Sequence, residues 1–366
     1  MLLNMNYKKI AILTGGGDCP GLNAVIRAIT KSALSKGHEV YGVLDGFGGL
    51  VEGRIHRLEE TDVHSIISIG GTILGTTNRD NPFHFARKTE SGTVFEDRHL
   101  EAVANLKRSG IDTLFVVGGD GSLNIAAELA NKTDVKIISV PKTIDNDLSG
   151  TDRTFGFDTA VSVATDAIDR LRTTGESHHR VMVLEVMGRY AGWIALHAGI
   201  AGGADCILVP EIPFLPEKIS ECILARKKSG YSSSIVVVGE GAKPVDGDVT
   251  VARIVPDSFE QIRLGGIGNK VAELIETNTG IESRCTVLGY VQRGGTPTAY
   301  DRVLSTRYGA EAFLAFERAE SSVLVALKGD SVATVPFIEV NKMPHLIPVS
   351  NEVMATARNI GICFGD

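Results

Sequence analysis

Glycine residues gather directly after two short apolar runs, where a turn can approach a ligand. Residues 15–17 are glycines after the run 10–13, and residues 118–122 (Gly-Gly-Asp-Gly-Ser) directly follow the run 113–117. Glycine lets backbone N–H groups approach a phosphate, and a helix that begins there adds roughly half a positive charge. Neither spacing matches GxxxxGK(S/T) or GxGxxG, and each loop alone also fits a tight turn. Together they favour a nucleotide site in which Asp120 would hold Mg²⁺.

A third loop carries two carboxylates two positions apart. Residues 141–147 read Pro-Lys-Thr-Ile-Asp-Asn-Asp and follow the apolar run 136–140. Asp145 and Asp147 would divide the roles of base and orienting group toward a substrate hydroxyl. Most acidic turns are only solvated turns. Here the preceding strand directs the loop to the same sheet edge as the glycine loops, which favours the catalytic interpretation.

Five arginines are candidates for binding phosphate, namely Arg79, Arg180, Arg189, Arg284 and Arg293. A planar guanidinium group binds phosphate through paired hydrogen bonds, and a site for a sugar phosphate plus a nucleotide needs several. An isolated arginine more often forms a surface ion pair that contributes under about 1 kcal/mol. Arg189 and Arg293 have glycine beside them, which leaves room for a ligand, so they are the stronger candidates.

Alternating strands and helices are needed to position these loops. Further β-like runs occur at residues 181–186, 206–209 and 234–238, and helical patterns at residues 158–172 and 269–276. Such alternation predicts right-handed βαβ crossovers and a parallel sheet, with ligands at the carboxyl ends of the strands. The predicted fold class is therefore α/β.

Length and composition exclude several classes of protein. The chain has 366 residues, 43% of them hydrophobic, so we expect two lobes rather than one core. A formal net charge of −7 argues against a dedicated binder of nucleic acid or membrane surfaces. The five cysteines are scattered without CxxC spacing, which predicts reduced thiols in a cytoplasmic protein. Without an apolar run of about 18 residues, no membrane span is expected.

Taken in order, a set of motifs resembles the phosphofructokinase family, whose members use ATP or pyrophosphate. The motifs are GGDCPGLN, GGDGS, PKTIDND, MGR, GEG and RCTVLGYVQRGG. The resemblance implies two similar lobes, each a mostly parallel sheet flanked by helices, with the active site between them. We expect residues 1–156 plus 292–342 to form the nucleotide-binding lobe and residues 157–291 plus 343–366 the sugar-phosphate lobe. It also implies a homotetramer or homodimer whose active sites are shared between subunits.

The activity that the resemblance implies is a phosphoryl transfer in glycolysis. The γ-phosphate of Mg-ATP would move to the 1-hydroxyl of fructose 6-phosphate, giving fructose 1,6-bisphosphate. Asp145 would be the base, with Thr143 and Asp147 positioning the substrate and metal-bound water beside Lys142. Such a reaction asks mainly for positioning and charge neutralisation, and an arginine from a second subunit is worth about 10³ or more in rate.

The resemblance also assigns binding roles position by position. The residues expected at ATP and Mg²⁺ are Gly17, Arg79, Gly119, Asp120, Gly121 and Ser122, with Asp120 on the metal. Those expected at the sugar phosphate are Thr143, Asp145, Arg180, Met187, Gly188, Arg189, Glu240, Arg284, Tyr290 and Arg293. Glu240 would accept a hydrogen bond from a sugar hydroxyl. Arg180 and Arg284 would reach the 6-phosphate from a neighbouring subunit, and Arg189 would also contact the migrating charge.

Two positions indicate different phosphoryl donors. Lys142 stands where ATP-using members often have glycine, which resembles the pyrophosphate-using branch. Gly121 stands where that branch usually has aspartate, whose carboxylate would crowd and repel the α-phosphate of ATP. Because a clash excludes ATP while a lysine only adds attraction, Gly121 weighs more and ATP is the favoured donor. The combination resembles the mixed-substrate subgroup of the family.

Three other functions stay open on the sequence. The first is a pyrophosphate-dependent phosphofructokinase. The second is an NAD-kinase-type enzyme, which shares the GGDG loop but does not account for PKTIDND or VLGYVQRGG. The third is a non-catalytic nucleotide sensor, against which the presence of Asp120, Asp145 and Arg189 argues. At Tyr290 the family usually has histidine, so the phenol could bind the 6-phosphate without adding positive charge.

Overall fold

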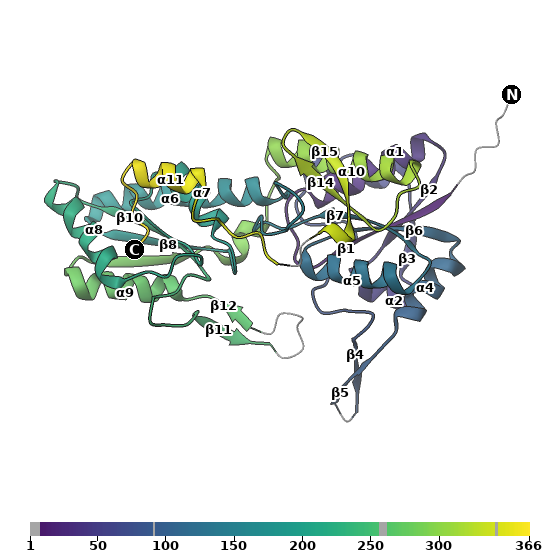
Figure 1. The fold of residues 1–366 in the computed structure, drawn as a ribbon, viewed down its shortest axis with the longest axis horizontal. Helices are drawn as coiled ribbons and strands as arrows, with labels where there is room; N and C mark the ends of the chain where they lie inside the picture. Colours follow the sequence, from purple (N-terminus) through teal and green to yellow (C-terminus); the bar gives the residue numbers. More distant parts are fainter. Residues whose placement is uncertain (1–7, 91, 256–261, 341–342) are drawn as a thin grey trace.

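Two β-sheets organise the chain, which the computed structural model describes for residues 8–90, 92–255, 262–340 and 343–366 (Figure 1). The larger sheet has the strand order β15 (Ser331–Pro336), β14 (Val323–Lys328), β7 (Lys136–Pro141), β6 (Ile111–Gly118), β1 (Lys9–Gly15), β2 (Glu39–Val43) and β3 (Ile55–Leu58). The smaller sheet has the order β13 (Ser283–Val287), β8 (Val181–Val186), β10 (Ser234–Gly239) and β9 (Cys206–Leu208). Two hairpins stand apart, β4 (Phe85–Thr89) with β5 (Gly92–Glu96), and β11 (Val251–Ile254) with β12 (Ile262–Leu264).

Most neighbouring strands run parallel. In the larger sheet only the outermost strands, β3 and β15, pair antiparallel to their neighbours, and in the smaller sheet every pair is parallel. The predicted α/β class with two mostly parallel sheets is confirmed. The predicted apolar runs became β1, β6, β7, β8, β9 and β10, with bounds within about two residues.

Helices cover both faces of each sheet. They are α1 (Leu22–Ser35), α2 (Gly46–Glu52), α3 (Glu60–Val63), α4 (His99–Arg108), α5 (Asp120–Lys132), α6 (Phe157–His178), α7 (Trp193–Ala201), α8 (Pro216–Lys228), α9 (Ile267–Thr279), α10 (Ala299–Glu317) and α11 (Glu352–Asn359), with short 3₁₀ turns η1 (Ile66–Ser68), η2 (Gly289–Arg293) and η3 (Phe337–Glu339). No helix among the described residues is long and apolar enough to cross a bilayer.

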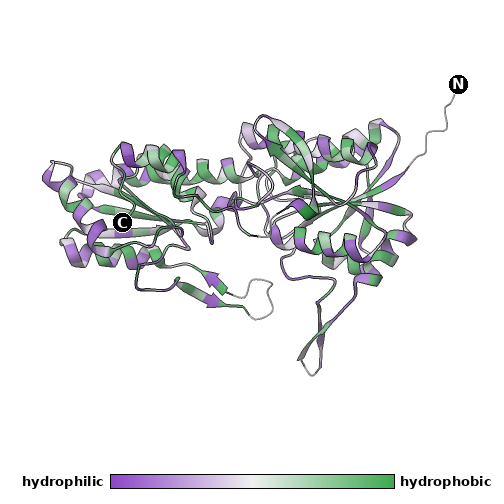
Figure 2. Ribbon diagram, in the orientation of Figure 1, coloured by the Kyte–Doolittle hydropathy of each residue, from purple (hydrophilic) through white to green (hydrophobic). Residues whose placement is uncertain are grey.

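Side chains of each central strand alternate between two buried layers, because successive residues of a strand point to opposite faces. In β1, Ile10 and Ile12 pack in the layer formed by α1 and α10, while Ala11 and Leu13 pack against α2, α4 and α5. The strands are accordingly among the most hydrophobic parts of the ribbon, and polar residues mark the outer helix faces (Figure 2).

The layer under α1 and α10 continues without a break into the smaller sheet, where α6, α7 and α11 cover one face. Here Asp301, at the start of α10, accepts hydrogen bonds from Thr159 N and Oγ1 in α6 at 2.8 and 2.5 Å. Asp301 is fully buried, and its Oδ2 atom joins the two lobes through both hydrogen bonds. The relative position of the two sheets, and therefore of the residues between them, follows from this shared core.

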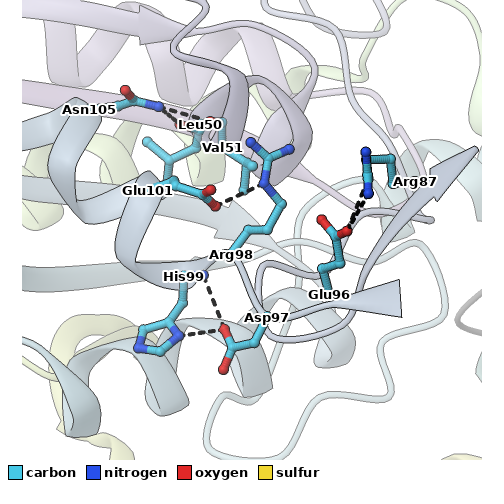
Figure 3. A network of polar contacts seen from close by, with 9 residues as sticks. All are labelled: Leu50, Val51, Arg87, Glu96, Asp97, Arg98, His99, Glu101 and Asn105. Atoms are coloured by element: carbon cyan, nitrogen blue, oxygen red, sulfur yellow. Dashed lines mark hydrogen bonds and ion pairs between the residues drawn. The ribbon is translucent and has the colours of Figure 1, made fainter. Parts of the chain in front are cut away.

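Polar contacts fix the outer elements of the larger lobe (Figure 3). The buried side chain of Asn105 in α4 donates to Leu50 O and Val51 O, both at 2.9 Å, and so ties α4 to the end of α2. In the neighbouring hairpin, Arg87 of β4 pairs with Glu96 of β5 at 2.8 Å. The tie to Asn105 matters most, since α2 borders the cavity of the candidate site.

Candidate active site

The carboxyl ends of three neighbouring strands lie side by side in the larger sheet. Gly15 of β1 pairs in register with Gly118 of β6, and Gly118 pairs with Pro141 of β7. Both glycine loops and the acidic loop, residues 142–147, therefore begin at one edge of this sheet. All three border a cavity of about 1020 Å³ that extends to the smaller sheet.

Fifteen of the eighteen predicted site residues line this cavity. They are Gly17, Arg79, Gly119, Asp120, Gly121, Ser122, Lys142, Thr143, Asp145, Asp147, Met187, Arg189, Glu240, Tyr290 and Arg293. Gly188, Arg180 and Arg284 are not among the lining residues. Residues from three loops of the larger sheet and from the strand ends of the smaller one thus meet in a single space.

The glycines of the first two loops are required by close packing. A Cβ atom on Gly15 would lie 2.5 Å from Ser122 Oγ, and one on Gly118 would collide with Ser122 Cβ. One on Gly17 would lie 2.9 Å from Arg293 Nη1. Real Cβ atoms do not approach so closely, so any larger residue would displace its neighbour. The small residues therefore let the loops pack closely against Ser122 and Arg293.

The loop that carries Arg79 is fastened to the first glycine loop. Gly16 N donates to Thr77 O at 2.9 Å, and Thr76 Oγ1 donates to Gly16 O at 2.7 Å. The backbone N–H of Arg79 donates to Thr77 Oγ1 at 3.2 Å. These bonds hold Arg79 at the cavity wall beside the glycines.

Lys142 connects the acidic loop to the first glycine loop. Its Nζ atom donates to Gly17 O, and the residue is buried. Burial lowers the pKa of the Lys142 ammonium group below its ordinary value. The sequence alone places Lys142 only in a loop. The structure shows that its ammonium group contacts the turn at Gly17.

The acidic loop has a defined conformation around its two carboxylates. Thr143 Oγ1 accepts a hydrogen bond from Asp145 N at 3.1 Å, and Asn146 adopts a left-handed conformation with φ of 54°. The Asn146 side chain accepts from Thr154 N at 2.9 Å, which anchors the turn. Burial, followed by the negative charge of Asp145, raises the pKa of Asp147. Two carboxylates therefore share one partly desolvated space, a setting that suits general acid–base chemistry.

The smaller sheet adds a carboxyl group and an arginine at the carboxyl ends of β8 and β10. Arg189 donates from Nη1 to Ile262 O of β12 at 2.7 Å and lies over the ring of Tyr190, 5.1 Å from its centroid. Burial raises the pKa of Glu240 to about 8, with further contributions from the charges of Asp145 and Glu185. Glu240 is thus mainly protonated near neutral pH in the ligand-free chain.

Tyr290 and Arg293 both lie on η2 but differ in their surroundings. Tyr290 is 74% exposed, whereas Arg293 donates from Nη1 to Asp18 O at 3.3 Å. Arg293 therefore contacts the first glycine loop, on the side predicted to hold the nucleotide, while Tyr290 remains open to solvent at the cavity wall.

Arg180 and Arg284 lie at the other end of the smaller sheet. Arg180 precedes β8 and pairs with Glu282 at 2.8 Å, and Arg284 near the start of β13 pairs with Glu282 and, at 3.6 Å, with Glu276. Strands β8 and β13 are parallel, so both arginines sit at amino ends, opposite Glu240. One chain alone does not bring them to the cavity, and their role in a neighbouring subunit stays a prediction.

Comparison with known proteins decides the family. A family model described as phosphofructokinase matches residues 9–316. The chain belongs to the phosphofructokinase family. It is 50% identical over 360 residues to a protein of Chloroflexus aurantiacus named ATP-dependent 6-phosphofructokinase, covering 98% of each chain. It is also 48% identical over 359 residues to a protein of Streptomyces coelicolor named pyrophosphate–fructose 6-phosphate 1-phosphotransferase, covering 98% of this chain and 100% of that protein.

A solved structure of the same family has a similar fold. Phosphofructokinase from Pichia pastoris in its T-state matches with a TM-score of 0.76 at 33% identity. The match covers 91% of this chain and 35% of the yeast chain, so this phosphofructokinase spans about a third of that chain's length. As a member of the family, the chain is a phosphotransferase that acts on an alcohol group.

Some residues at the phosphofructokinase cavity escaped the sequence analysis. Glu185 is 2% exposed near the carboxyl end of β8 and accepts hydrogen bonds from Gly266 N at 3.0 Å and Gly268 N at 2.7 Å, at the start of α9. In the sequence, the signal for Glu185 was an acidic residue within the apolar run 181–186. Asp80, whose pKa burial raises, also lines the cavity, and no local pattern indicates it.

Proposed function

We propose that this chain is an ATP-dependent 6-phosphofructokinase, which transfers the γ-phosphate of Mg-ATP to the 1-hydroxyl of fructose 6-phosphate. The observation that carries the proposal is the meeting of Asp120, Asp145 and Arg189 in one cavity between the two sheets. Phosphoryl transfer depends on holding donor and acceptor together and neutralising charge, and this cavity offers backbone amides, carboxylates and cations within one space.

Asp145 is the proposed base that accepts the proton of the sugar 1-hydroxyl. Thr143, whose hydroxyl accepts from Asp145 N, orients the turn, and Asp147 adds a second carboxylate beside it. Arg189 is the proposed partner of the migrating phosphoryl charge, and Met187 and Glu240 would contact the sugar. Since Glu240 is mainly protonated in the free chain, it can donate as well as accept a hydrogen bond there.

The residues present fit a magnesium ion that arrives with the nucleotide. Among the described residues no group of three or more histidines, cysteines or carboxylates is arranged to hold a metal. Mg²⁺ commonly binds to one or two carboxylates together with substrate phosphates. Asp120 and Asp147 would provide the carboxylates, and the nucleotide would provide the phosphates. The charge of Asp120 contributes to the raised pKa of Asp147, so a cation near them would relieve their repulsion. Bound there, Mg²⁺ would neutralise phosphate charge.

ATP is the proposed donor because the cavity offers more than phosphate-binding groups. Near α5 its wall includes Ile125 and Phe337, which share one hydrophobic cluster, and Leu324. An apolar wall suits a nucleobase, and pyrophosphate contains no such group. Lys142 at the first glycine loop favours pyrophosphate as the second candidate, and relatives of both names occur at 48–50% identity.

We further propose that two or four chains assemble and share their active sites. The proposed location of this assembly is the cytoplasm. The nucleotide lobe would comprise residues 1–156 plus 292–342 and the sugar lobe residues 157–291 plus 343–366, of which residues 1–7, 91, 256–261 and 341–342 lie outside the described part. Arg180 and Arg284 face away from their own cavity, as the family resemblance predicts for residues that act in a neighbour's site.

One assay tests the donor directly. The same preparation is given fructose 6-phosphate and Mg²⁺ with either ATP or pyrophosphate, and we expect a higher kcat/KM with ATP. In Gly121→Asp the added carboxylate should lower kcat/KM for ATP about 100-fold or more and spare any activity with pyrophosphate. Ala225→Asp, which adds the same carboxylate at an exposed position of α8, is the matched control. Higher kcat/KM with pyrophosphate in the unmodified enzyme would overturn the choice of ATP.

A further inference from the structure

Three cysteines from distant parts of the chain gather at the edge of the smaller sheet. Cys206 lies in the edge strand β9, Cys222 in α8, and Cys363 in the segment that follows α11. All three are free thiols, and none lines the active-site cavity. The established family activity does not use them, so their proximity invites a separate explanation.

Cys363 and Cys206 are paired through the backbone. They form a parallel β-bridge, in which Ile207 N donates to Cys363 O at 2.8 Å and Cys363 N donates to Asp205 O at 3.1 Å. Adjacent strands lie about 4.8 Å apart, and a disulfide needs a Cα separation of about 4.4–6.8 Å. Both side chains belong to the same hydrophobic layer, against α8 and α9. The pair therefore meets the Cα-separation requirement for a disulfide.

Cys222 completes the group from the side of α8. Its Sγ atom lies 3.8 Å from Asp205 O, the carbonyl oxygen that also accepts from Cys363 N. In turn Cys363 Sγ lies 4.0 Å from Lys218 O, one helical turn before Cys222. The sulfur of Cys363 thus faces both β9 and α8.

Hydrogen-bond donors around Cys363 favour its thiolate, while burial and the charge of Asp366 oppose it. Thiol hydrogen bonds from Cys206 and then Cys222 lower the pKa of Cys363, and Gly365 N donates to its sulfur at 3.2 Å. The pKa values of Cys206 and Cys222 are raised by the same contacts with Cys363. Cys363 is partly exposed, whereas Cys206 is fully buried. An oxidant from solution would therefore meet a nucleophilic sulfur at Cys363, with a second thiol behind it.

We propose that Cys363 is a site of reversible oxidation by peroxides, and that Cys206 resolves it by forming a disulfide. The Cys363 thiolate attacks one oxygen of hydrogen peroxide, the O–O bond breaks, and the departing hydroxide is protonated to water, leaving a sulfenic acid. The sulfur of Cys206 then attacks the sulfenic sulfur, and the released hydroxide takes the Cys206 thiol proton as a second water. Two thiols and one peroxide give one disulfide and two waters.

The disulfide would fasten the segment after α11 to β9. This segment already packs Phe364 into the core and accepts from Leu215 N at Gly365 O, at 2.7 Å. A covalent link between residues 206 and 363 closes a long loop in the unfolded chain, which disfavours unfolding. We therefore expect the oxidised protein to have a higher midpoint of thermal unfolding than the reduced protein.

The test uses the full chain in its native state. After treatment with hydrogen peroxide and removal of the excess, thiol titration in denaturant should show a fall from five free cysteines to three. Peptide mapping should recover one linked pair, Cys206 with Cys363, and dithiothreitol should restore the thiols. Cys363→Ser should abolish this loss, whereas Cys285→Ser, which removes a partly buried cysteine on β13, should not.

Peptide mapping of the unmodified chain keeps the proposal falsifiable even if a variant folds poorly. An unchanged thiol count would overturn the proposal, as would oxidation at Cys19 or Cys285 with Cys363 intact. A linked pair of Cys222 and Cys363 would overturn the assignment of Cys206 as the resolving thiol.

Discussion

The two sheets contribute to the cavity in different ways. At the larger sheet, groups come from short loops that follow β1, β6 and β7 directly, and one chain brings them all to the cavity. At the smaller sheet, Glu240 and Arg189 reach the cavity, while Arg180 and Arg284 lie at the opposite end. Under the proposed roles of Arg180 and Arg284, the donor side would be complete within one chain and the sugar side would need a neighbouring chain. Under these roles, a change at Asp145 should act on kcat, and a change at Arg284 should act on binding of the sugar.

The largest effect is expected for Asp145→Asn. Loss of the proposed base should lower kcat by about 10²–10⁴, because the amide cannot accept the proton, while KM for both substrates changes little. Steady-state kinetics, together with calorimetric measurement of fructose 6-phosphate binding, would separate the effect on kcat from the effect on substrate binding. Asp169→Asn, an exposed aspartate of α6, is the matched control. An unchanged kcat would reject Asp145 as the base.

A smaller effect, on binding, is expected for Arg284→Ala. A lost charged hydrogen bond to phosphate corresponds to about 1.5–3 kcal/mol, or roughly a 10- to 150-fold rise in KM for fructose 6-phosphate. Arg170→Ala, which removes an exposed pair with Asp166 on α6, should leave KM unchanged.

Mixing two variants tests whether active sites are shared between chains. If sites are shared between chains, hybrids of Arg284→Ala and Asp145→Asn should regain activity, because some sites then combine an intact Asp145 with an intact Arg284. Activity of the mixture equal to the average of the two variants would contradict the sharing of sites.

The same contrast explains how far the sequence alone could go. The strands β1, β6 and β7 and their loops were predictable, because an apolar run followed by glycine or a Pro-Lys turn is a local signal. The contact of Lys142 with Gly17 was not, since it joins residues 125 positions apart. Glu185 left a local mark as an acid within a buried strand, but its partners at Gly266 and Gly268 depend on where α9 docks.

Other elements left weaker signals. Strands β2 and β3 and the hairpin β4–β5 were not predicted. All four strands are short, and β3, β4 and β5 are in addition largely polar or exposed. The position of Arg293 against Asp18 follows from the docking of η2 on the first glycine loop, a contact across 275 positions that no spacing encodes. Contacts that depend on tertiary packing, such as that of Arg293 with Asp18, could therefore be found only in the folded chain.

The smallest expected effect concerns the dependence of stability on pH at the sugar side. The raised pKa of Glu240, about 8 against an ordinary 4.5, means that the folded chain binds more protons than the unfolded chain between these values. Stability contributed by this group therefore falls as the pH rises from about 4.5 to 8. Glu240→Gln removes this dependence, so its urea-unfolding free energy should decline less between pH 5 and 8 than that of the unmodified chain.

Asp147 also has a raised pKa and adds a decline of the same sign, but it is present in both proteins and cancels in the difference. Glu273→Gln, on the exposed face of α9, should keep the full decline of the unmodified chain. Equal declines in all three proteins would mean that Glu240 is hydrated rather than desolvated, and the sugar side would then lack the buried neutral carboxyl that separates it from the donor side.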